Sequence, residues 1–353
     1  MNILILGGTG AMGVPLTKLF LADGHSVTVT SRSERPSDNK NLKYIKGNAK
    51  DLSFIKDMLT NNDWDAVVDF MTYNTAQFKE RYKMFLKNTK HYIFTSSARV
   101  YAECEGKITE DSPRLLDVST DKEYLATDEY ALTKARQEDL LKNSGESNWT
   151  VVRPTITYSD IRLQLGVMEK ENWLYRALKG RSIVFSKDIR DKYTTMTTAE
   201  DVALGMRALV GNEKAMGEVF HITSDYSYKW TEILDCYLDV IEEKTGKRPK
   251  VFYTEKAVKL KFPSAKYQVI YCRYFDRQFD NKKIAQFIDI SQFEKPIDGL
   301  KKSLELFLEH KNFKAINWTF EAYNDKAAGE WTKLSEIPAP KTRLKYLKNR
   351  LFG

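Results

Sequence analysis

Short apolar runs alternate with helical patterns over the first 160 residues of the chain. Six strands are predicted, over Asn2–Leu6, Ser26–Thr30, Leu42–Lys46, Asp65–Met71, Lys90–Thr95 and Trp149–Val152. Helices are predicted between them, over Val14–Ala22, Leu52–Leu59, Thr75–Leu86 and Glu129–Lys142. This alternation predicts an α/β fold, with a doubly wound parallel sheet covered by helices on both faces.

The pattern is looser after residue 160. Helices are predicted over Glu171–Leu178, Ala199–Val210, Trp230–Glu243 and Ile297–Glu309, and one more strand over Phe220–Ile222. We expect this half to form a smaller lobe at the carboxyl ends of the strands, where open α/β sheets bind ligands. The expected first lobe is 1–159 with about 181–224, the second is about 160–180 with 225–340, and a basic tail occupies 341–353.

The amino-acid composition is typical of a globular protein. Of 353 residues, 42% are hydrophobic and 29% are charged, as in ordinary globular chains. The three cysteines lie far apart and form no C-x-x-C pair, so a disulfide framework is not expected. The four histidines are scattered, so a metal site is not expected either. The net charge is +8, and five basic residues with no acidic one lie in 341–353, so a broad nucleic-acid surface is not indicated. The reducing cytoplasm is the expected compartment.

A glycine loop follows the first predicted strand directly. Residues 7–13 read Gly-Gly-Thr-Gly-Ala-Met-Gly, with G-x-G-x-x-G spacing at Gly8, Gly10 and Gly13. Gly10 lets backbone N–H groups approach a pyrophosphate at a helix N-terminus, and Gly13 lets the helix pack closely on the strand. The loop predicts dinucleotide binding; a purely structural glycine turn is the alternative.

The end of the second predicted strand lacks the acidic residue that usually binds the adenosine ribose. The segment reads Thr30-Ser31-Arg32-Ser33. A carboxylate there would accept from the ribose hydroxyls and repel a 2′-phosphate, whereas Ser31 with Arg32 could hold that phosphate. This favours NADP over NAD as the cofactor; a solvated basic loop is the alternative.

Tyr130 and Lys134 form a Y-x-x-x-K pair on one face of a predicted helix. An ammonium near the phenol favours phenolate, so Tyr130 could move a proton to or from a substrate oxygen while hydride moves to nicotinamide. Ser96 and Ser97 follow the fifth strand, and their hydroxyls would lie beside the tyrosine. A surface pair and a strand-end turn are the structural alternatives.

Taken in order, these motifs resemble the extended short-chain dehydrogenase/reductases of the NAD-dependent epimerase/dehydratase (nucleotide-sugar) family. The matching segments are Gly7–Gly13, Ser96–Tyr101, Tyr130 with Lys134, Arg153-Pro154 and Glu200–Ala203, within about residues 1–225. The resemblance implies a Rossmann-like sheet with a smaller C-terminal α/β substrate lobe.

The resemblance also implies roles for single residues. Ser97 would hydrogen-bond the reacting oxygen, Tyr130 would be the acid/base, and Lys134 would bind the nicotinamide ribose and tune Tyr130. The implied cofactor-binding residues are Gly7, Gly10, Ala11, Met12, Gly13, Ser31, Arg32, Asn48, Ala49, Phe70, Met71, Thr72, Tyr130, Lys134 and Pro154.

Several departures from the family pattern place the chain in an atypical branch. They include the missing acidic residue at the second predicted strand and Tyr158-Ser159-Asp160 in place of the usual Tyr-Gly-Pro. The 4,6-dehydratases carry an Asp-Glu pair where Ala98 and Arg99 stand, so dehydration by that route is not expected. Thr194 stands where the family usually has a phosphate-binding arginine. The candidate substrate-binding residues are therefore Arg99, Arg190 and Lys192.

These features predict an NAD(P)-dependent epimerase or reductase that acts on a nucleotide-activated sugar. The alternative is a non-catalytic cofactor-sensing or RNA-associated protein on the same fold. No nucleic-acid partner is expected, and a homodimer is left open alongside a monomer.

The basic tail has a helical pattern of its own. Leu344, Leu347 and Leu351 fall at i, i+3 and i+7, on one helical face. In the favoured interpretation these leucines pack on the protein's own second lobe. The alternative is a weak peripheral contact of residues 341–353 with an anionic membrane surface.

Overall fold

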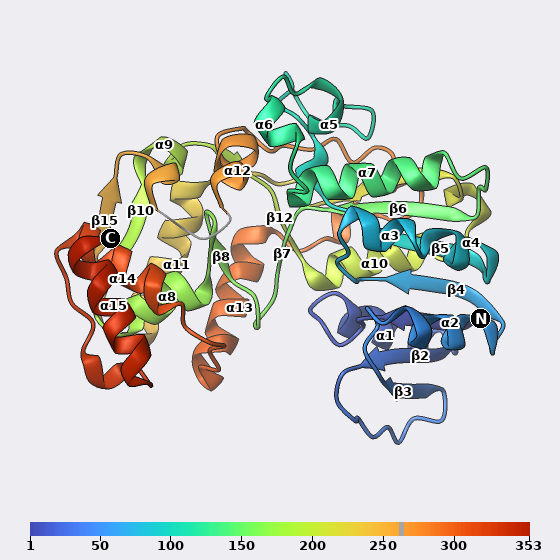
Figure 1. Cartoon of the computed structure of the whole chain (residues 1–353), viewed down its shortest axis with the longest axis horizontal. Helices are drawn as coiled ribbons and strands as arrows, with labels where there is room; N and C mark the ends of the chain where they lie inside the picture. The colour runs from blue at the N-terminus through green and yellow to red at the C-terminus, as the bar shows by residue number, and fades with distance from the viewer. Residues whose placement is uncertain (261–264) are drawn as a thin grey trace. The chain divides into compact units, whose positions relative to one another are not determined.

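The computed structural model describes residues 1–260 and 265–353 (Figure 1). They form two compact units. The first unit comprises Met1–Thr157, Met196–Asp225 and Phe279–Glu294, and the second comprises Tyr158–Thr195, Tyr226–Gln278 and Lys295–Gly353. Residues 181–195 and 279–294 therefore group differently from the expected lobes.

The first unit is built on a seven-stranded parallel sheet, which confirms the predicted fold class. The strand order is β13-β6-β5-β4-β1-β2-β3, and every neighbouring pair is parallel. The strands are β1 (Asn2–Leu6), β2 (Ser26–Ser31), β3 (Leu42–Lys46), β4 (Trp64–Asp69), β5 (Thr89–Thr95), β6 (Trp149–Pro154) and β13 (Glu218–Ile222). Because the order reverses between β1 and β4, the carboxyl ends of these two strands mark the ligand-binding edge of such a sheet.

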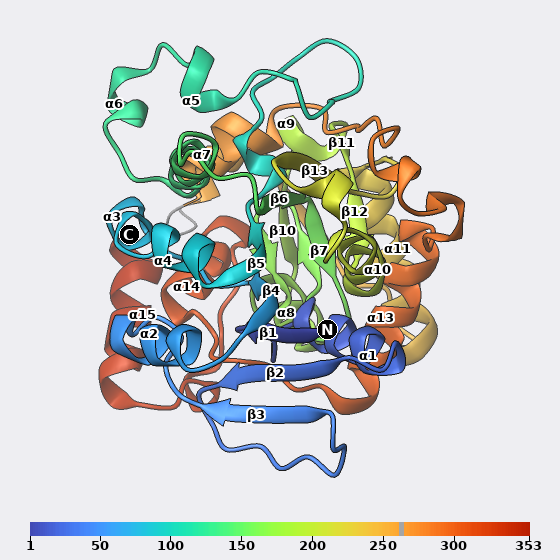
Figure 2. The same cartoon turned by 90° about the vertical axis from the view of Figure 1, so that its right-hand side faces the viewer.

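Helices cover both faces of this sheet (Figure 2). Ile3 and Ile5 of β1 pack on the side of α1 (Gly13–Ala22) and α10 (Ala199–Leu209). Leu4 and Leu6 face the opposite side, where α2 (Leu52–Thr60), α3 (Thr75–Lys79), α4 (Tyr82–Lys87) and α7 (Tyr130–Lys142) contribute to the core. A strand that is buried on both faces is apolar at successive positions, which explains the sequence of β1.

The single helix predicted over Thr75–Leu86 is wrong, because the chain forms two helices there, α3 and α4. Arg81 has a φ of −123° between them. Its side chain is buried, with the guanidinium carbon 4.7 Å from the centroid of the Tyr73 ring. The helical pattern is therefore interrupted at a buried charged residue.

Shorter elements complete the first unit and its connections. They are α5 (Leu115–Val118), α6 (Lys122–Leu125), β7 (Ile156–Tyr158), β12 (Met196–Thr198) and the 3-10 turn η1 (Ala98–Val100).

The second unit is mainly helical. Its longer helices are α8 (Lys170–Leu178), α11 (Trp230–Thr245), α13 (Pro296–His310), α14 (Trp318–Ala328) and α15 (Pro340–Phe352). Shorter elements are β8 (Gln164–Leu165), β9 (Met168–Glu169), β10 (Ile183–Ser186), α9 (Lys187–Arg190), β11 (Tyr193–Thr194), β14 (Tyr228–Lys229), β15 (Val251–Thr254) and α12 (Lys266–Gln268). β10 pairs with β15 in parallel, and the Trp173 ring of α8 stacks on Tyr237 of α11 at 4.5 Å between centroids.

A buried ionic cluster fixes α14 against α8. The Arg176 guanidinium donates to Glu321 at 2.7 Å, to Asp325 at 2.8 Å and to Glu330 at 3.0 Å. Arg176 is fully buried, so these carboxylates must supply the hydrogen bonds that water otherwise would.

The tail is helical as predicted, but its leucines do not share one environment. Leu347 packs with the small cluster around buried Tyr346, whereas Leu344 and Leu351 are 68% and 50% exposed. The favoured interpretation, in which all three leucines pack on the protein, is wrong for Leu344 and Leu351. The residue that buries itself against α14 is Tyr346, whose hydroxyl reaches Asp325.

Within residues 1–260 and 265–353, no helix has the length and apolarity that a bilayer crossing requires. Over the same residues, no cluster of three potential metal-ligating side chains occurs, and Cys104, Cys236 and Cys272 are free thiols.

Candidate functional site

The glycine loop between β1 and α1 has the shape of an anion cradle. Gly7 has a φ of +71°, and its N–H donates to the Thr30 hydroxyl at 3.0 Å. A Cβ at Gly13 would lie 2.4 Å from the Cα of Gly8, so only glycine fits there. α1 begins without a side-chain cap at Met12, and a helix N-terminus suits a pyrophosphate, although the Val14 N–H already donates to the Gly10 carbonyl at 3.1 Å and Pro15 has no N–H. Gly10, Ala11 and Met12 lie in this loop, as predicted.

The predicted adenosine-binding residues follow β2 and β3, which are neighbouring strands. Ser31 is the last residue of β2 and is buried, and its Oγ accepts from the Ser33 N–H at 3.2 Å. Arg32 is exposed beside it. After β3, Asn48 is exposed and Ala49 is buried. The basic side chain at the end of β2 is compatible with a 2′-phosphate.

The end of β4 borders the glycine loop. Phe70 and Met71 are half-buried and Thr72 is exposed. The Met71 sulfur lies 2.9 Å from the position that a Cβ of Gly7 would take, so this segment and the loop are in contact. Pro154 ends β6 and is buried.

Tyr130 and Lys134 lie at the start of α7, with very different exposure. Tyr130 is the first residue of the helix and is 36% exposed, whereas Lys134 is 2% exposed. The Lys134 ammonium donates to the Thr95 carbonyl at 2.7 Å and lies 6.0 Å from the centroid of the Tyr130 ring. The phenol is therefore accessible, while the ammonium is held beneath it at the end of β5.

Two buried carboxylates act on Lys134. Burial lowers the pKa of Lys134 to about 8, and the charges of Asp69 and Glu138 oppose that shift. Asp69, at the end of β4, is itself fully buried, and burial raises its pKa to about 6. It accepts from the Met71 N–H and from the Tyr92 hydroxyl, both at 2.8 Å. Near neutral pH, Lys134 is therefore charged and Asp69 is its buried counter-charge.

Glu138 explains why the two adjacent serines differ. The Ser96 hydroxyl donates to Glu138 at 2.6 Å, and Arg153 of β6 donates to both oxygens of Glu138 at 2.9 and 2.6 Å. Burial raises the pKa of Glu138, but Arg153, the Ser96 hydrogen bond and the Arg114 charge together more than offset this and hold the pKa below its usual value. Ser96 is thus committed to the interior. Ser97 is buried as well, and its role toward a substrate stays a prediction.

Ser97 and Arg99 reach the neighbourhood of Tyr130 through the turn η1. The Ser97 Oγ accepts from the Arg99 N–H at 3.2 Å. The guanidinium of Arg99 pairs with Glu129 and its Cζ lies 5.3 Å from the centroid of the Tyr130 ring. The fold therefore gathers the predicted Ser97, Arg99, Tyr130 and Lys134 in one region.

Sequence reasoning missed Asp69 and Glu138. Glu138 carried a signal, because it lies four residues after Lys134 and eight after Tyr130, on the same helical face. Asp69 is a polar residue at the end of a buried strand, and its relation to Lys134 depends on the pairing of β4 with β5.

Arg190 and Lys192, the other predicted substrate residues, belong to the second unit. The Arg190 guanidinium lies 5.8 Å from the centroid of the Tyr253 ring and 3.5 Å from the Asp191 carboxylate. Lys192 is half-exposed. Their role toward a substrate stays a prediction.

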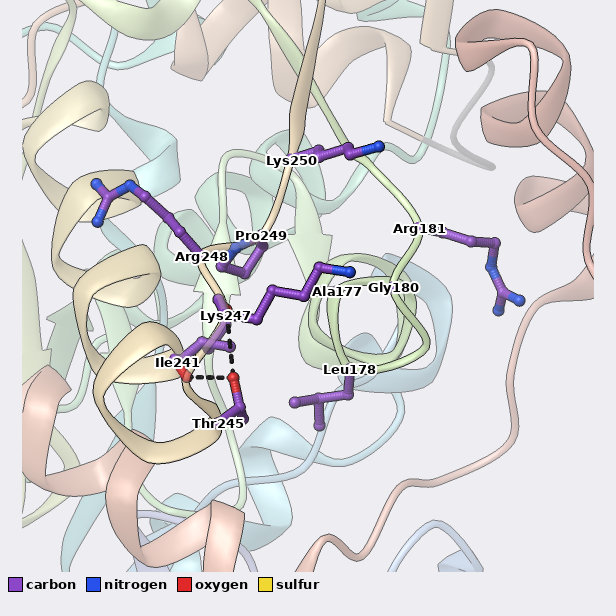
Figure 3. Close-up of a pocket in the computed structure, with 10 residues that line it drawn as sticks. All are labelled: Ala177, Leu178, Gly180, Arg181, Ile241, Thr245, Lys247, Arg248, Pro249 and Lys250. Carbon is purple, nitrogen blue, oxygen red and sulfur yellow. Dashed lines mark hydrogen bonds between the residues drawn. The ribbon is translucent and has the colours of Figure 1, made fainter.

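A basic pocket of about 190 Å³ lies within the second unit (Figure 3). Its charged lining residues are Arg181, Lys247, Arg248 and Lys250. Arg181 is bonded to Glu321 and Glu336, and Arg248 to Asp239 and Glu242, so two of the four charges are already neutralised. None of the predicted site residues lines this pocket.

The first half of the chain matches a known protein family. A family model described as NAD(P)H-binding matches residues 7–183. This span contains the glycine loop, the Y-x-x-x-K pair and the serines after β5, and so agrees with the cofactor predicted from the sequence.

Two curated relatives and one solved structure extend the comparison. A chloroplast stem-loop binding protein of Arabidopsis thaliana is 27% identical over 240 residues, covering 64% of this chain and 59% of the relative. A 2′-dehydrokanamycin reductase of Streptomyces kanamyceticus is 23% identical, covering 67% and 65%. The UDP-glucuronic acid 4-epimerase of Bacillus cereus, solved with NAD, has a TM-score of 0.63 at 17% identity, covering 88% of this chain and all of that one. The chain thus spans about six tenths of the length of the curated relatives, and the likeness to the epimerase is one of fold.

Proposed function

Since the chain belongs to the NAD(P)H-binding family, we propose that it is an NAD(P)-dependent epimerase or reductase that acts on a nucleotide-activated sugar. The observation that carries the proposal is the arrangement of Tyr130 over the buried Lys134 ammonium at the end of β5. The glycine loop after β1 lies at the same carboxyl edge of the sheet.

The glycine loop supports binding of the dinucleotide. The uncapped start of α1 and the contact between Gly8 and Gly13 fit a pyrophosphate, as described above. NADP is the preferred form in this proposal, because Arg32 and Ser31 at the end of β2 suit a 2′-phosphate and no acidic residue stands in the segment 30–33 to repel it.

The reaction proposed for the site is a proton transfer coupled to hydride transfer. The bound nicotinamide supplies the hydride acceptor or donor. Tyr130 takes the proton from a sugar hydroxyl during oxidation, or returns it during reduction, while Ser97 donates a hydrogen bond to the same oxygen. Lys134 stabilises the phenolate by its positive charge. Ala98 and Arg99 offer no carboxyl group for the elimination of water, so a 4,6-dehydratase is not proposed.

Tyr130→Phe tests the assignment of the acid/base. Turnover of an active nucleotide sugar, found from a panel by absorbance at 340 nm and by product stereochemistry, should fall by at least about 100-fold. Cofactor affinity should stay within a few-fold, because the lost hydroxyl acts on the substrate. Tyr226→Phe is the matched control, because Tyr226 is 45% exposed, lies in the second unit and is not among the predicted site residues. Near-full activity of the Tyr130→Phe protein would refute the assignment.

An RNA-associated role is the second candidate, and the stem-loop binding relative is the observation that favours it. Gel-shift titration with an RNA stem-loop tests this role. Specific binding that is unaffected by Tyr130→Phe, together with no turnover on any sugar, would replace the enzymatic proposal. The cytoplasmic location stays a prediction, and light scattering decides between a monomer and a homodimer.

A further inference from the structure

The helix α15 attaches to its unit by one face only. Tyr346 is fully buried, and its hydroxyl donates to Asp325 at 2.6 Å. On the same side, the Arg343 and Arg350 side chains donate to the carbonyls of Ile337 and Glu330 at 2.8 and 2.9 Å. These contacts hold the helix against its own unit and set which residues face outward.

The outward face combines large apolar side chains with lysines. Leu344, Leu351 and Phe352 are 68%, 50% and 82% exposed. Lys341, Lys345 and Lys348 are exposed as well. Because successive residues of a helix turn by about 100°, these six positions fall within an arc of about 120°, and we call this arc the outer face of α15.

In the part of the chain that the structure describes, this positive charge is not paired with carboxylates. α15 contains no acidic residue. Among residues 1–260 and 265–353, none of the ammonium groups of Lys341, Lys345 and Lys348 forms a salt bridge. The outer face therefore presents three free charges between three exposed apolar side chains.

We propose that the outer face of α15 binds the surface of an anionic lipid membrane. Leucine and phenylalanine side chains enter the headgroup boundary, and lysine stems extend along it with their ammonium groups at the phosphates. Charge complementarity selects this occupant. A second copy of the same face would bring three like charges against three others, and a nucleic-acid backbone would use the lysines but leave Leu344, Leu351 and Phe352 in water.

Vesicle co-sedimentation of the full chain tests the proposal. The probe is phosphatidylcholine vesicles containing about 30% phosphatidylserine, compared with phosphatidylcholine alone, at low and at high salt. We expect binding to the anionic vesicles at low salt that weakens as salt rises. Replacing Lys341, Lys345 and Lys348 by glutamine should lower the partition coefficient by roughly 100-fold, from about a fivefold contribution per lysine.

A second variant separates insertion from charge. Leu344→Ser with Leu351→Ser removes two of the apolar side chains without changing charge, and should also weaken binding by at least about tenfold. Leu306→Ser is the matched control, since Leu306 is an exposed leucine of α13, and should bind as the parent does. Cofactor affinity should be unchanged in all three variants, because none of them touches the first unit.

Several outcomes would overturn the proposal. They are no sedimentation at low salt, equal binding to neutral vesicles, and binding unaffected by both sets of substitutions. Binding of an RNA stem-loop that is lost when Lys341, Lys345 and Lys348 are replaced, but kept in the Leu344→Ser, Leu351→Ser variant, would assign the face to nucleic acid. A dimer that dissociates in the Leu344→Ser, Leu351→Ser variant would assign it to self-association.

Discussion

Asp69→Asn removes the buried counter-charge of Lys134 while nearly preserving shape. Asp69 pairs in register with Phe94 of β5, and the Lys134 ammonium lies 4.5 Å from the centroid of the Phe94 ring. Burial lowers the pKa of Lys134, and the negative charge of Asp69 is the largest of the influences that raise it. The substitution should therefore lower the pKa of Lys134 further below its present value of about 8.

A nearby opposite charge can shift a pKa by about one unit or more, and the charge of Asp69 acts on Lys134 in this way. A shift of one unit corresponds to about 1.4 kcal/mol between the two protonation states. At pH 8, the protonated share of Lys134 would then fall from about one half to about one tenth. The sign follows from charge, because a cation that loses its counter-anion releases its proton at lower pH. If activity needs the ammonium, the loss of activity with rising pH should begin at a lower pH in the variant than in the parent protein. The acidic side of the pH–activity curve should change less.

Carbon NMR of the lysine Cε, recorded against pH on lysine-labelled protein, measures this pKa without a substrate. Ordinary lysines titrate near pH 10.4, so Lys134 should stand apart, and its signal is assigned by its loss in Lys134→Met. Tyr92→Phe is the control, because it deletes a hydrogen bond to Asp69 but keeps the charge. A Lys134 midpoint in Asp69→Asn equal to or above that of the parent would refute the reasoning.

Three further predictions concern the first unit. In titrations of cofactor fluorescence, Arg32→Ala should weaken NADPH binding by about tenfold and leave NADH binding unchanged, because one charge-assisted phosphate contact contributes about 1.4 kcal/mol. Equal losses of affinity for both cofactors would contradict the proposed NADP preference. Glu138→Gln should lower the free energy of unfolding by about 3 kcal/mol in urea denaturation, because it leaves buried Arg153 without its counter-charge. Gly13→Ala should abolish NADPH binding and lower the melting temperature, because its methyl group would meet the backbone of Gly8 at 2.4 Å; unchanged affinity would contradict this account of the loop.

The sequence by itself determined the features that depend on near neighbours. The apolar run that became β1 could be recognised because a strand buried on both faces is apolar at successive positions. The glycine loop and the Tyr130–Lys134 pair could be recognised because a turn and a helix each bring residues of fixed spacing together. Local backbone geometry is enough for such predictions.

Only the tertiary structure decided what surrounds those residues. It commits Ser96 to Glu138, brings the charge of Asp69 to act on Lys134, and turns Leu344 outward while Tyr346 is buried. Each of these relations joins chain segments that are distant in sequence or lie on opposite faces of one helix. The chemistry of a buried polar group depends on which partners replace its water, and only the packing of strands and helices selects those partners.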